Sequence, residues 1–272
     1  MGAQEIAAVR ARLVEHAQED CASLAEAEAE ALWFRKPKDL DEAEYQEAKS
    51  LVNDLKHRPH AFVIGCIMDR QIDADRAWCV PYRLAQRIGC PEEPRFSFCT
   101  LLELSEDAIQ GHMKGPPSLH WLHKEMSCHV HAALRRIADQ YEGRAEKIWN
   151  DRPSSAGLVY RFLEFEGIGP KIATMAANIL VRQFKIRVGD YSSLDISSDR
   201  HVHRVFHRLG LLPKGASREQ VIYRARDLNP EYPGSLDGPV WEIGRDWCRP
   251  KNPNCSECFM KDICPTAARL AA

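Results

Sequence analysis

The sequence lacks the features that mark a membrane protein or a secreted protein. No stretch approaches the ~20 consecutive apolar residues that a transmembrane helix needs. Residues 1–20 carry charges every few positions and contain no apolar signal-peptide core. The alternating pattern of β-strands does not persist anywhere, and internal repeats and low-complexity tracts are absent. We therefore expect a cytoplasmic, all-α protein that has no membrane partner.

An excess of charge of one sign is also lacking, because 37 Lys and Arg nearly balance 39 Asp and Glu and the net charge is only −2. Such a balance gives the whole chain no general attraction to nucleic acid. The distribution is uneven, however. Residues 1–60 hold 8 Lys and Arg against 13 Asp and Glu, whereas residues 143–214 hold 12 against 7. The basic region could be a local phosphate-binding face, or its charges could be scattered over a helical surface, and the count does not decide between them.

Cysteine is abundant, with ten residues, and four of them crowd the C-terminal end. In a reducing compartment such a group indicates metal ligation rather than disulfides. Structural zinc sites usually use two CxxC pairs that lie far apart. A single CxxC with two outlying cysteines at unequal spacings favours a cubane iron–sulfur cluster, and zinc remains the alternative. The four candidate ligands follow a C-x6-C-x2-C-x5-C pattern: Cys248, Cys255, Cys258 and Cys264.

This spacing resembles the [4Fe-4S] signature of the endonuclease III branch of the helix-hairpin-helix DNA glycosylases, and it matches at all four positions. The preceding Gly244-Arg245 also fits the approach to the first cysteine in that family. The resemblance implies a [4Fe-4S] cofactor. It also implies that the loop between the first two ligands presents basic residues to DNA, which here are Arg249 and Lys251.

A second motif, Gly167-Ile168-Gly169-Pro170-Lys171, lies between helices expected over 155–165 and 171–184. Glycines suit a sharp turn that approaches a ligand closely, and the N–H groups of the turn and the helix start can bind an anion. Any turn between two helices can use glycine, so the motif alone is weak evidence. It resembles the hairpin of the same family, which grips a DNA phosphate without reading sequence.

Lys171 follows this hairpin directly. A lysine near the positive end of a helix dipole, if it is also desolvated, favours its neutral form and can act as a nucleophile. The alternative is a solvated lysine, or one that only contacts phosphate. The resemblance implies that Lys171 attacks the sugar C1′ and forms a Schiff base.

Asp199 opens the segment 199–205 (DRHVHRV), where it is a suitable N-cap for a helix. The segment resembles the family's D-x-H-[VI]-x-R-V stretch, which implies that Asp199 stabilises the cationic sugar and helps to deprotonate the attacking group. The segment 172–198 is longer than is usual in the family. It therefore puts the relative geometry of Lys171 and Asp199 in question, and Asp190 or Asp195 could take the role of Asp199.

Gln71 follows an apolar helix that is expected to begin at Pro59. The resemblance places there the glutamine that fills the gap left by a flipped base, and the alternative is a surface glutamine. Adenine-excising members carry a catalytic glutamate a few residues earlier, where this chain has residues 66–68 (CIM), so mismatched adenine is not the expected substrate. Four tryptophans are expected to lie in the core rather than to serve as base-stacking platforms: Trp78, Trp121, Trp149 and Trp241.

The resemblance therefore predicts an all-α, two-lobed helix-hairpin-helix fold with a C-terminal cluster loop. We expect N-terminal helices over 1–53, a helical barrel with the hairpin over 54–192, and a cluster-bearing lobe over 193–272. The implied function is removal of a damaged or mismatched base from double-stranded DNA, with β-elimination lyase activity, by a monomer associated with a bacterial or archaeal nucleoid. The alternatives are an inactive damage-binding protein and an iron–sulfur regulatory or redox protein.

Overall fold

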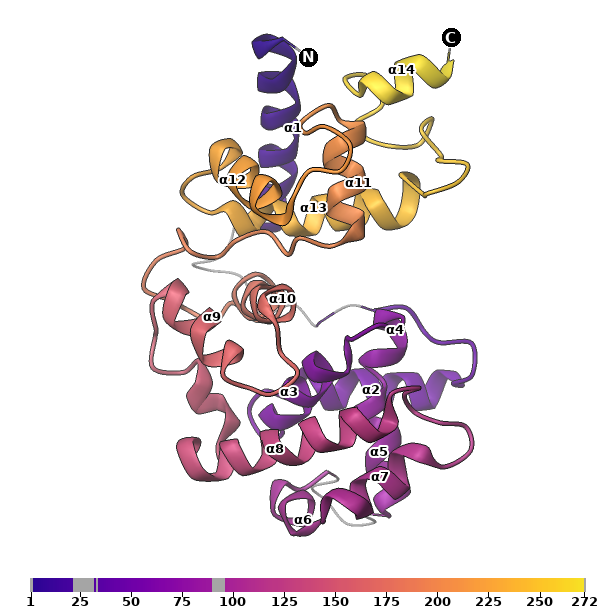
Figure 1. Cartoon of the computed structure of the whole chain (residues 1–272), viewed down its shortest axis with the longest axis vertical. Coiled ribbons are helices and arrows are strands. Elements are labelled where there is room, and N and C mark those ends of the chain that lie inside the picture. Colours follow the sequence, from indigo (N-terminus) through magenta and orange to yellow (C-terminus); the bar gives the residue numbers. More distant parts are fainter. Residues whose placement is uncertain (1, 22–31, 33, 90–95, 272) are drawn as a thin grey trace. The chain divides into compact units, whose positions relative to one another are not determined.

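The computed structural model describes residues 2–21, 32, 34–89 and 96–271, and over these residues it is helical with no β-strand (Figure 1). The predicted all-α fold is therefore confirmed. Within the same residues, no helix has the length and apolar character needed to cross a membrane. The first of the helices expected over 1–53 is α1 (Ala3–Cys21), and residues 22–31 of that range lie outside the described residues.

The chain divides into two compact units, which are described separately. Unit 1 comprises Met1–Glu28, Ser154–Val159 and Ala177–Ala272, and unit 2 comprises Ala29–Pro153 and Tyr160–Ala176. This division differs from the boundaries predicted after residues 53 and 192. Helix α2 (Glu42–Asn53) belongs to unit 2 because its buried face packs against the neighbouring helices α3 and α5.

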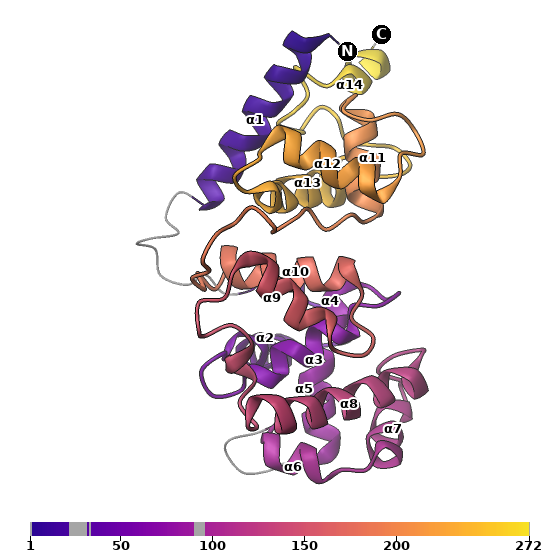
Figure 2. The same cartoon turned by 60° about the vertical axis from the view of Figure 1, so that its left-hand side comes forward.

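Unit 2 is built around α3, in which all ten residues are buried. Proline at the first position starts this helix without losing an intrahelical hydrogen bond. Helix α3 contacts α2, α5 and α8, which gather around it in both views (Figures 1 and 2). The helical elements of this unit that follow α2 are α3 (Pro59–Met68), α4 (Ala74–Ala77), α5 (Val80–Ile88), α6 (Phe98–Glu103), α7 (Glu106–Lys114), α8 (His123–Tyr141) and η1 (Ala145–Ile148).

Two further helices, α9 (Ser155–Leu163) and α10 (Pro170–Arg182), carry the glycine hairpin between them. They match the two helices that the sequence predicts on either side of the motif. The border between the units runs through both helices, and the hairpin itself belongs to unit 2. Proline at the start of α10 fixes its first φ angle in the helical range, which ends the turn sharply.

Unit 1 packs the N-terminal helix against the C-terminal part of the chain. Val9, Leu13 and Ala17 of α1 share one core with residues of α11 and with Cys258 and Met260 of the cysteine loop. The remaining helical elements of this unit are α11 (Arg200–Arg208), α12 (Arg218–Leu228), η2 (Pro233–Leu236), α13 (Asp237–Glu242), the π-helical turn η3 (Ile243–Trp247) and α14 (Pro265–Ala271). The cysteine loop therefore rests on a core to which both ends of the sequence contribute.

Candidate iron–sulfur loop and nucleic-acid interface

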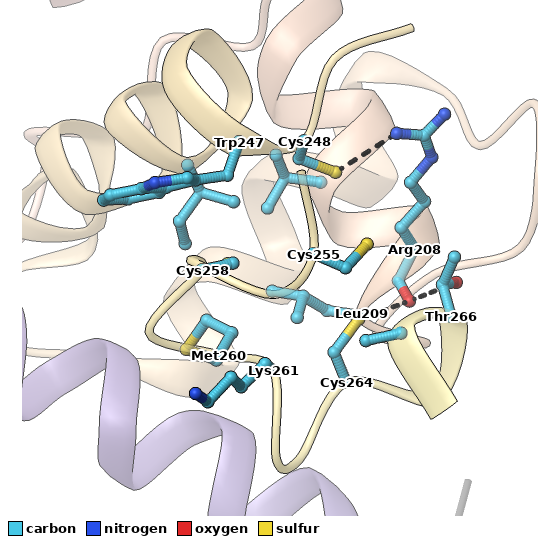
Figure 3. Close-up of a pocket in the computed structure, with 13 residues that line it drawn as sticks. Arg208, Leu209, Trp247, Cys248, Cys255, Cys258, Met260, Lys261, Cys264 and Thr266 are labelled. Atoms are coloured by element: carbon cyan, nitrogen blue, oxygen red, sulfur yellow. Dashed lines mark hydrogen bonds between the residues drawn. The ribbon is translucent and has the colours of Figure 1, made fainter. Parts of the chain in front are cut away.

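The four cysteines of the C-terminal motif line one pocket in unit 1, which Figure 3 shows. The π-helical turn η3 ends just before Cys248, and α14 begins directly after Cys264. Between them the chain has no regular helix, so four side chains separated by up to 16 positions can surround one space. Local turns, including a hydrogen bond from the Cys258 N–H to the Cys255 carbonyl, set the spacing of the central pair.

The donor set fits a multinuclear cluster. Burial raises the pKa of the Cys258 thiol to about 11 and also raises the pKa of Cys255, and in both cases neighbouring cysteines add to the rise. Such thiols become thiolates only when a metal supplies positive charge. Four thiols around a shared pocket suit a cluster, which is wider than the ~2.3 Å shell of a zinc ion.

Two arginines of α11 hold the loop in place. The Arg208 guanidinium donates to the Cys248 Sγ (3.4 Å) and to the carbonyls of Arg249 (2.6 Å) and Pro250 (3.0 Å). Arg204 donates to the carbonyls of Cys248 (2.6 Å) and Gly244 (2.7 Å). Figure 3 shows the Arg208 guanidinium beside the Cys248 sulfur. The motif that begins at Asp199 therefore supports the cysteine loop of the same unit.

The two basic residues that we expect to contact DNA project from this loop. Arg249 and Lys251 are both exposed, whereas Cys258 is buried. The Arg208 guanidinium holds the backbone carbonyl of Arg249, so the point from which the exposed Arg249 side chain projects is fixed. Each side chain is therefore available to a phosphate, as the prediction requires.

The glycine hairpin uses its two glycines for different reasons. Gly167 has a φ of 81°, and a Cβ placed on it would lie 2.6 Å from the Cδ2 atom of His129. Gly169 is exposed, and a Cβ placed on it would have no protein atom within 4 Å. The first glycine is thus required by the fold. The second leaves open space in front of the backbone, where a ligand can approach.

Lys171 occupies the second position of α10. Its ammonium lies 2.5 Å from the Oδ2 of Asp69, a carboxylate whose side chain is only 8% exposed, and 3.6 Å from the Sδ of Met175. The sequence expectation of a partly desolvated lysine is consistent with its side-chain exposure of 29%. The ion-pair partner was not predicted. Asp69 lies two positions before Gln71, but its separation of 102 positions from Lys171 leaves no local signal of the pair.

Asp199 is the N-cap of α11, as the sequence predicts. Its Oδ1 accepts hydrogen bonds from the N–H groups of His201 (2.7 Å) and Val202 (2.9 Å). The two alternatives are engaged elsewhere in unit 1. Asp195 forms two hydrogen bonds with the Arg226 guanidinium (2.7 and 2.9 Å), and Asp190 accepts from the Ser155 hydroxyl. Both carboxylates therefore have structural roles in the long segment between Lys171 and Asp199.

Gln71 lies in the turn between α3 and α4, with an exposed side chain and a left-handed backbone (φ 58°). Two residues before α8 hold this turn: the indole of Trp121 donates to the Gln71 carbonyl (3.2 Å), and the His120 ring bonds the Arg70 carbonyl (3.0 Å). The expectation that Trp121 lies in the core is wrong, because 60% of it is exposed. Trp78 and Trp149 are buried, as predicted, whereas Trp241 is only half-buried.

The candidate residues are distributed over both units. Unit 2 carries Gln71, the hairpin glycines and Lys171. Unit 1 carries Asp199 and the whole cysteine loop with its basic residues. Each unit therefore presents a candidate DNA contact of its own, and the residues of each group are positioned by contacts within that unit.

Comparisons with known proteins agree with this description. A family model described as the iron-sulfur binding domain of endonuclease III matches residues 248–264. Endonuclease III-like protein 1 of Gallus gallus is 35% identical over 120 residues, which are 42% of this chain and 38% of that protein. Endonuclease III of Thermotoga maritima is 33% identical over 150 residues, which are 55% of this chain and 63% of that protein. The chain thus spans less than two thirds of either relative.

The fold has solved counterparts. A structure described as a trapped endonuclease III-DNA covalent intermediate aligns with a TM-score of 0.57 over 84% of this chain and 99% of that chain, at 16% identity. At this identity the match concerns the fold. The iron–sulfur match covers all four candidate cysteines, and it agrees with the predicted [4Fe-4S] cofactor rather than zinc. In its cysteine loop, its relatives and its fold, the chain is similar to endonuclease III and endonuclease III-like proteins.

Proposed function

We propose that this protein is a DNA N-glycosylase that removes a damaged or mismatched base from double-stranded DNA and cleaves the resulting site by β-elimination. The observation that carries the proposal is the position of Lys171, directly after the hairpin and at the start of α10. Beside it, Gly169 leaves its backbone open to a phosphate. An amine next to a phosphate-binding turn is what attack on a deoxyribose requires.

In the proposed reaction, the neutral Lys171 amine donates its lone pair to C1′. The bond from C1′ to the base breaks, and the electron pair leaves with the base, which takes up a proton. The nitrogen that is now bonded to C1′ gives up one proton, the C1′–O4′ bond breaks as O4′ takes up a proton, and a protonated Schiff base remains. Loss of a proton from C2′ places a double bond between C2′ and C3′ and expels the 3′ phosphate. Water finally releases the lysine. Asp199, through its carboxylate charge, stabilises the cationic sugar.

The remaining candidate residues would bind and open the duplex. Gly167 and Gly169 shape the hairpin around one phosphate, and Arg249 and Lys251 contact the backbone from the cysteine loop. Gln71, exposed on a left-handed turn, would occupy the space that a flipped base leaves. Cys248, Cys255, Cys258 and Cys264 would hold the [4Fe-4S] cluster, whose part is to shape and charge this loop. The monomeric state and the cytoplasmic, nucleoid-associated location stay predictions.

A panel of duplexes, each with one lesion, tests this function. It should cover oxidised pyrimidines, oxidised purines, alkylated bases and deaminated bases, and it should report base release and strand cleavage separately. Borohydride should trap a covalent adduct on the right lesion. Lys171→Ala should abolish the adduct, and Lys171→Arg should not restore it because arginine stays protonated.

The same assays separate the alternatives. An inactive damage-binding protein would bind a lesion duplex tightly, but no preparation of the purified protein would release a base. An iron–sulfur regulatory or redox protein would bind DNA, if at all, without using the hairpin, so Gly169→Ala would leave its affinity unchanged. Base release that requires Lys171, with affinity that requires Gly169, is the combination that only the glycosylase predicts.

A further inference from the structure

The nearest charged partner of Lys171 is Asp69, which the sequence motifs did not identify. Asp69 is the C-cap of α3, where its N–H bonds the Cys66 carbonyl (3.2 Å). The end of a fully buried helix therefore fixes its backbone, and its side chain is 8% exposed. A carboxylate held this firmly in unit 2 gives the lysine a fixed partner.

The pair is strengthened by its surroundings. The Cys66 thiol of α3, near the ion pair, is completely buried. Burial raises the pKa of Cys66, the charge of Asp69 raises it further, and the charge of Lys171 lowers it. Both charges therefore act on a side chain that water does not reach. In such an environment opposite charges interact more strongly than on an exposed surface.

Several other charged groups near the pair form a second network. Arg70 contacts Glu125 of α8 (3.0 Å), and His129 of the same helix lies 3.5 Å from Glu125 and 3.9 Å from Glu166 of the hairpin. Asp69 and Lys171 thus form an ion pair beside a second charged network. Lys171 and Asp69 are 102 positions apart in the sequence. They meet because the end of α3 lies near the start of α10 in the fold.

We propose that Asp69 is a positioning residue that holds Lys171 as an ammonium ion and sets the pH at which its neutral amine becomes available. This inference rests on the proposed function for its biological meaning. Attack on C1′ requires a free lone pair, so the ion pair has to open and Lys171 has to lose a proton first. Asp69 thereby keeps the amine unreactive until DNA binding rearranges the pair.

The direct test measures Lys171 itself and needs no DNA. Iron-loaded, full-length protein is labelled with trace acetic anhydride at a series of pH values, and peptide mass spectrometry reports the acetylation of each lysine. In the wild type, Lys171 should reach half-maximal reactivity at a higher pH than the exposed Lys251. Asp69→Asn, which keeps the size and an acceptor oxygen, should shift the Lys171 curve to lower pH. Its reactivity at pH 8 should rise about tenfold, since an adjacent opposite charge shifts a pKa by about one unit or more.

Two variants serve as controls. Asp69→Glu keeps the charge and should retain the high-pH curve. Glu142→Gln removes the surface partner of Lys147, which lies 2.6 Å away, and should leave Lys171 unaffected. The proposal is overturned if Asp69→Asn leaves the Lys171 curve in place. It is equally overturned if wild-type Lys171 titrates at or below the pH of Lys251, a result that needs no variant to fold.

Borohydride trapping on an abasic-site duplex adds the functional readout. Asp69→Asn should move the pH dependence of trapping to lower pH in parallel with the acetylation curve, whereas a purely structural role would lower trapping at every pH. If the wild type forms no adduct, the proposed lyase activity fails while the acetylation result on Asp69 still stands. If trapping occurs but its pH dependence ignores Asp69, the proposed function survives and this inference does not.

Discussion

Gly167→Ala should destabilise unit 2, and two independent penalties set the size of the effect. A non-glycine residue in the left-handed region costs roughly 1–2 kcal/mol, and Gly167 has a φ of 81°. The new methyl would also stand 2.6 Å from His129 Cδ2 and 2.8 Å from its Cγ. Overpacking of this kind costs about 1–3 kcal/mol. The His129 side chain is only 14% exposed, so it has little room to move aside. Together the penalties predict a loss of roughly 2–5 kcal/mol in the free energy of unfolding.

Gly169→Ala is the matched control in the same turn. Its methyl meets no atom within 4 Å, so the free energy of unfolding should change by less than about 0.5 kcal/mol. Urea unfolding of the iron-loaded chain, followed by circular dichroism, measures both variants. Fluorescence anisotropy with labelled duplex should show weaker DNA binding for Gly169→Ala despite its unchanged stability, because the methyl fills the space that a phosphate needs.

A double-mutant cycle separates the two penalties at Gly167. In a His129→Ala background the steric part should disappear, and Gly167→Ala should then cost only the roughly 1–2 kcal/mol of the backbone conformation. Equal destabilisation by Gly167→Ala and Gly169→Ala would refute the reasoning. So would a cost at Gly167 that is the same with and without the His129 ring.

Three further predictions concern the other candidate residues. Cys258→Ser should lose the cluster and lower the melting temperature of unit 1, because ligation is coupled to folding. The iron content should be about four atoms per chain in the anaerobically purified wild type and clearly lower in the variant. Asp199→Asn should keep the helix cap and change the melting temperature little, yet it should slow base release. Asp195→Asn should instead lower the melting temperature, because it disrupts the ion pair with Arg226. If only Asp195→Asn slowed base release, the two assignments would have to be exchanged. Arg249→Ala and Lys251→Ala should each reduce the slope of log affinity against log salt by about one, and an unchanged slope would remove that residue from the DNA interface.

Much of the site could be predicted because its signals are local. A capping aspartate three residues before a hydrogen-bonded N–H, a glycine turn before a proline, and four cysteines at fixed spacings all act within a few turns of the chain. The structure accordingly places Asp199 at the start of α11 and Lys171 at the start of α10. It also places the four cysteines around one pocket.

The division into units could not be predicted in the same way. The helix of residues 42–53 is grouped by sequence with the other N-terminal helices in one segment, 1–53, that is expected to pack with the cluster lobe. Its buried side chains instead contact α3 and α5, and α1 packs on α13 and η2. Amphipathic periodicity shows that a helix buries one face, but it does not show which partner covers that face. Trp121 illustrates the same limit, because an aromatic residue in a helical pattern was expected to be buried and is exposed.

The sequence by itself therefore determined the helical fold, the helix boundaries around the hairpin, the iron–sulfur loop and the residues expected to do chemistry. Only the tertiary structure decided which groups act on them. Asp69 reaches Lys171 across 102 positions, and Arg226 holds Asp195 across 31. The physical reason is that the sequence around a carboxylate does not show which group it will contact. The same residue can be solvated, cap a helix or pair with a distant cation. Its role is fixed by the packing that brings a particular cation within bonding distance.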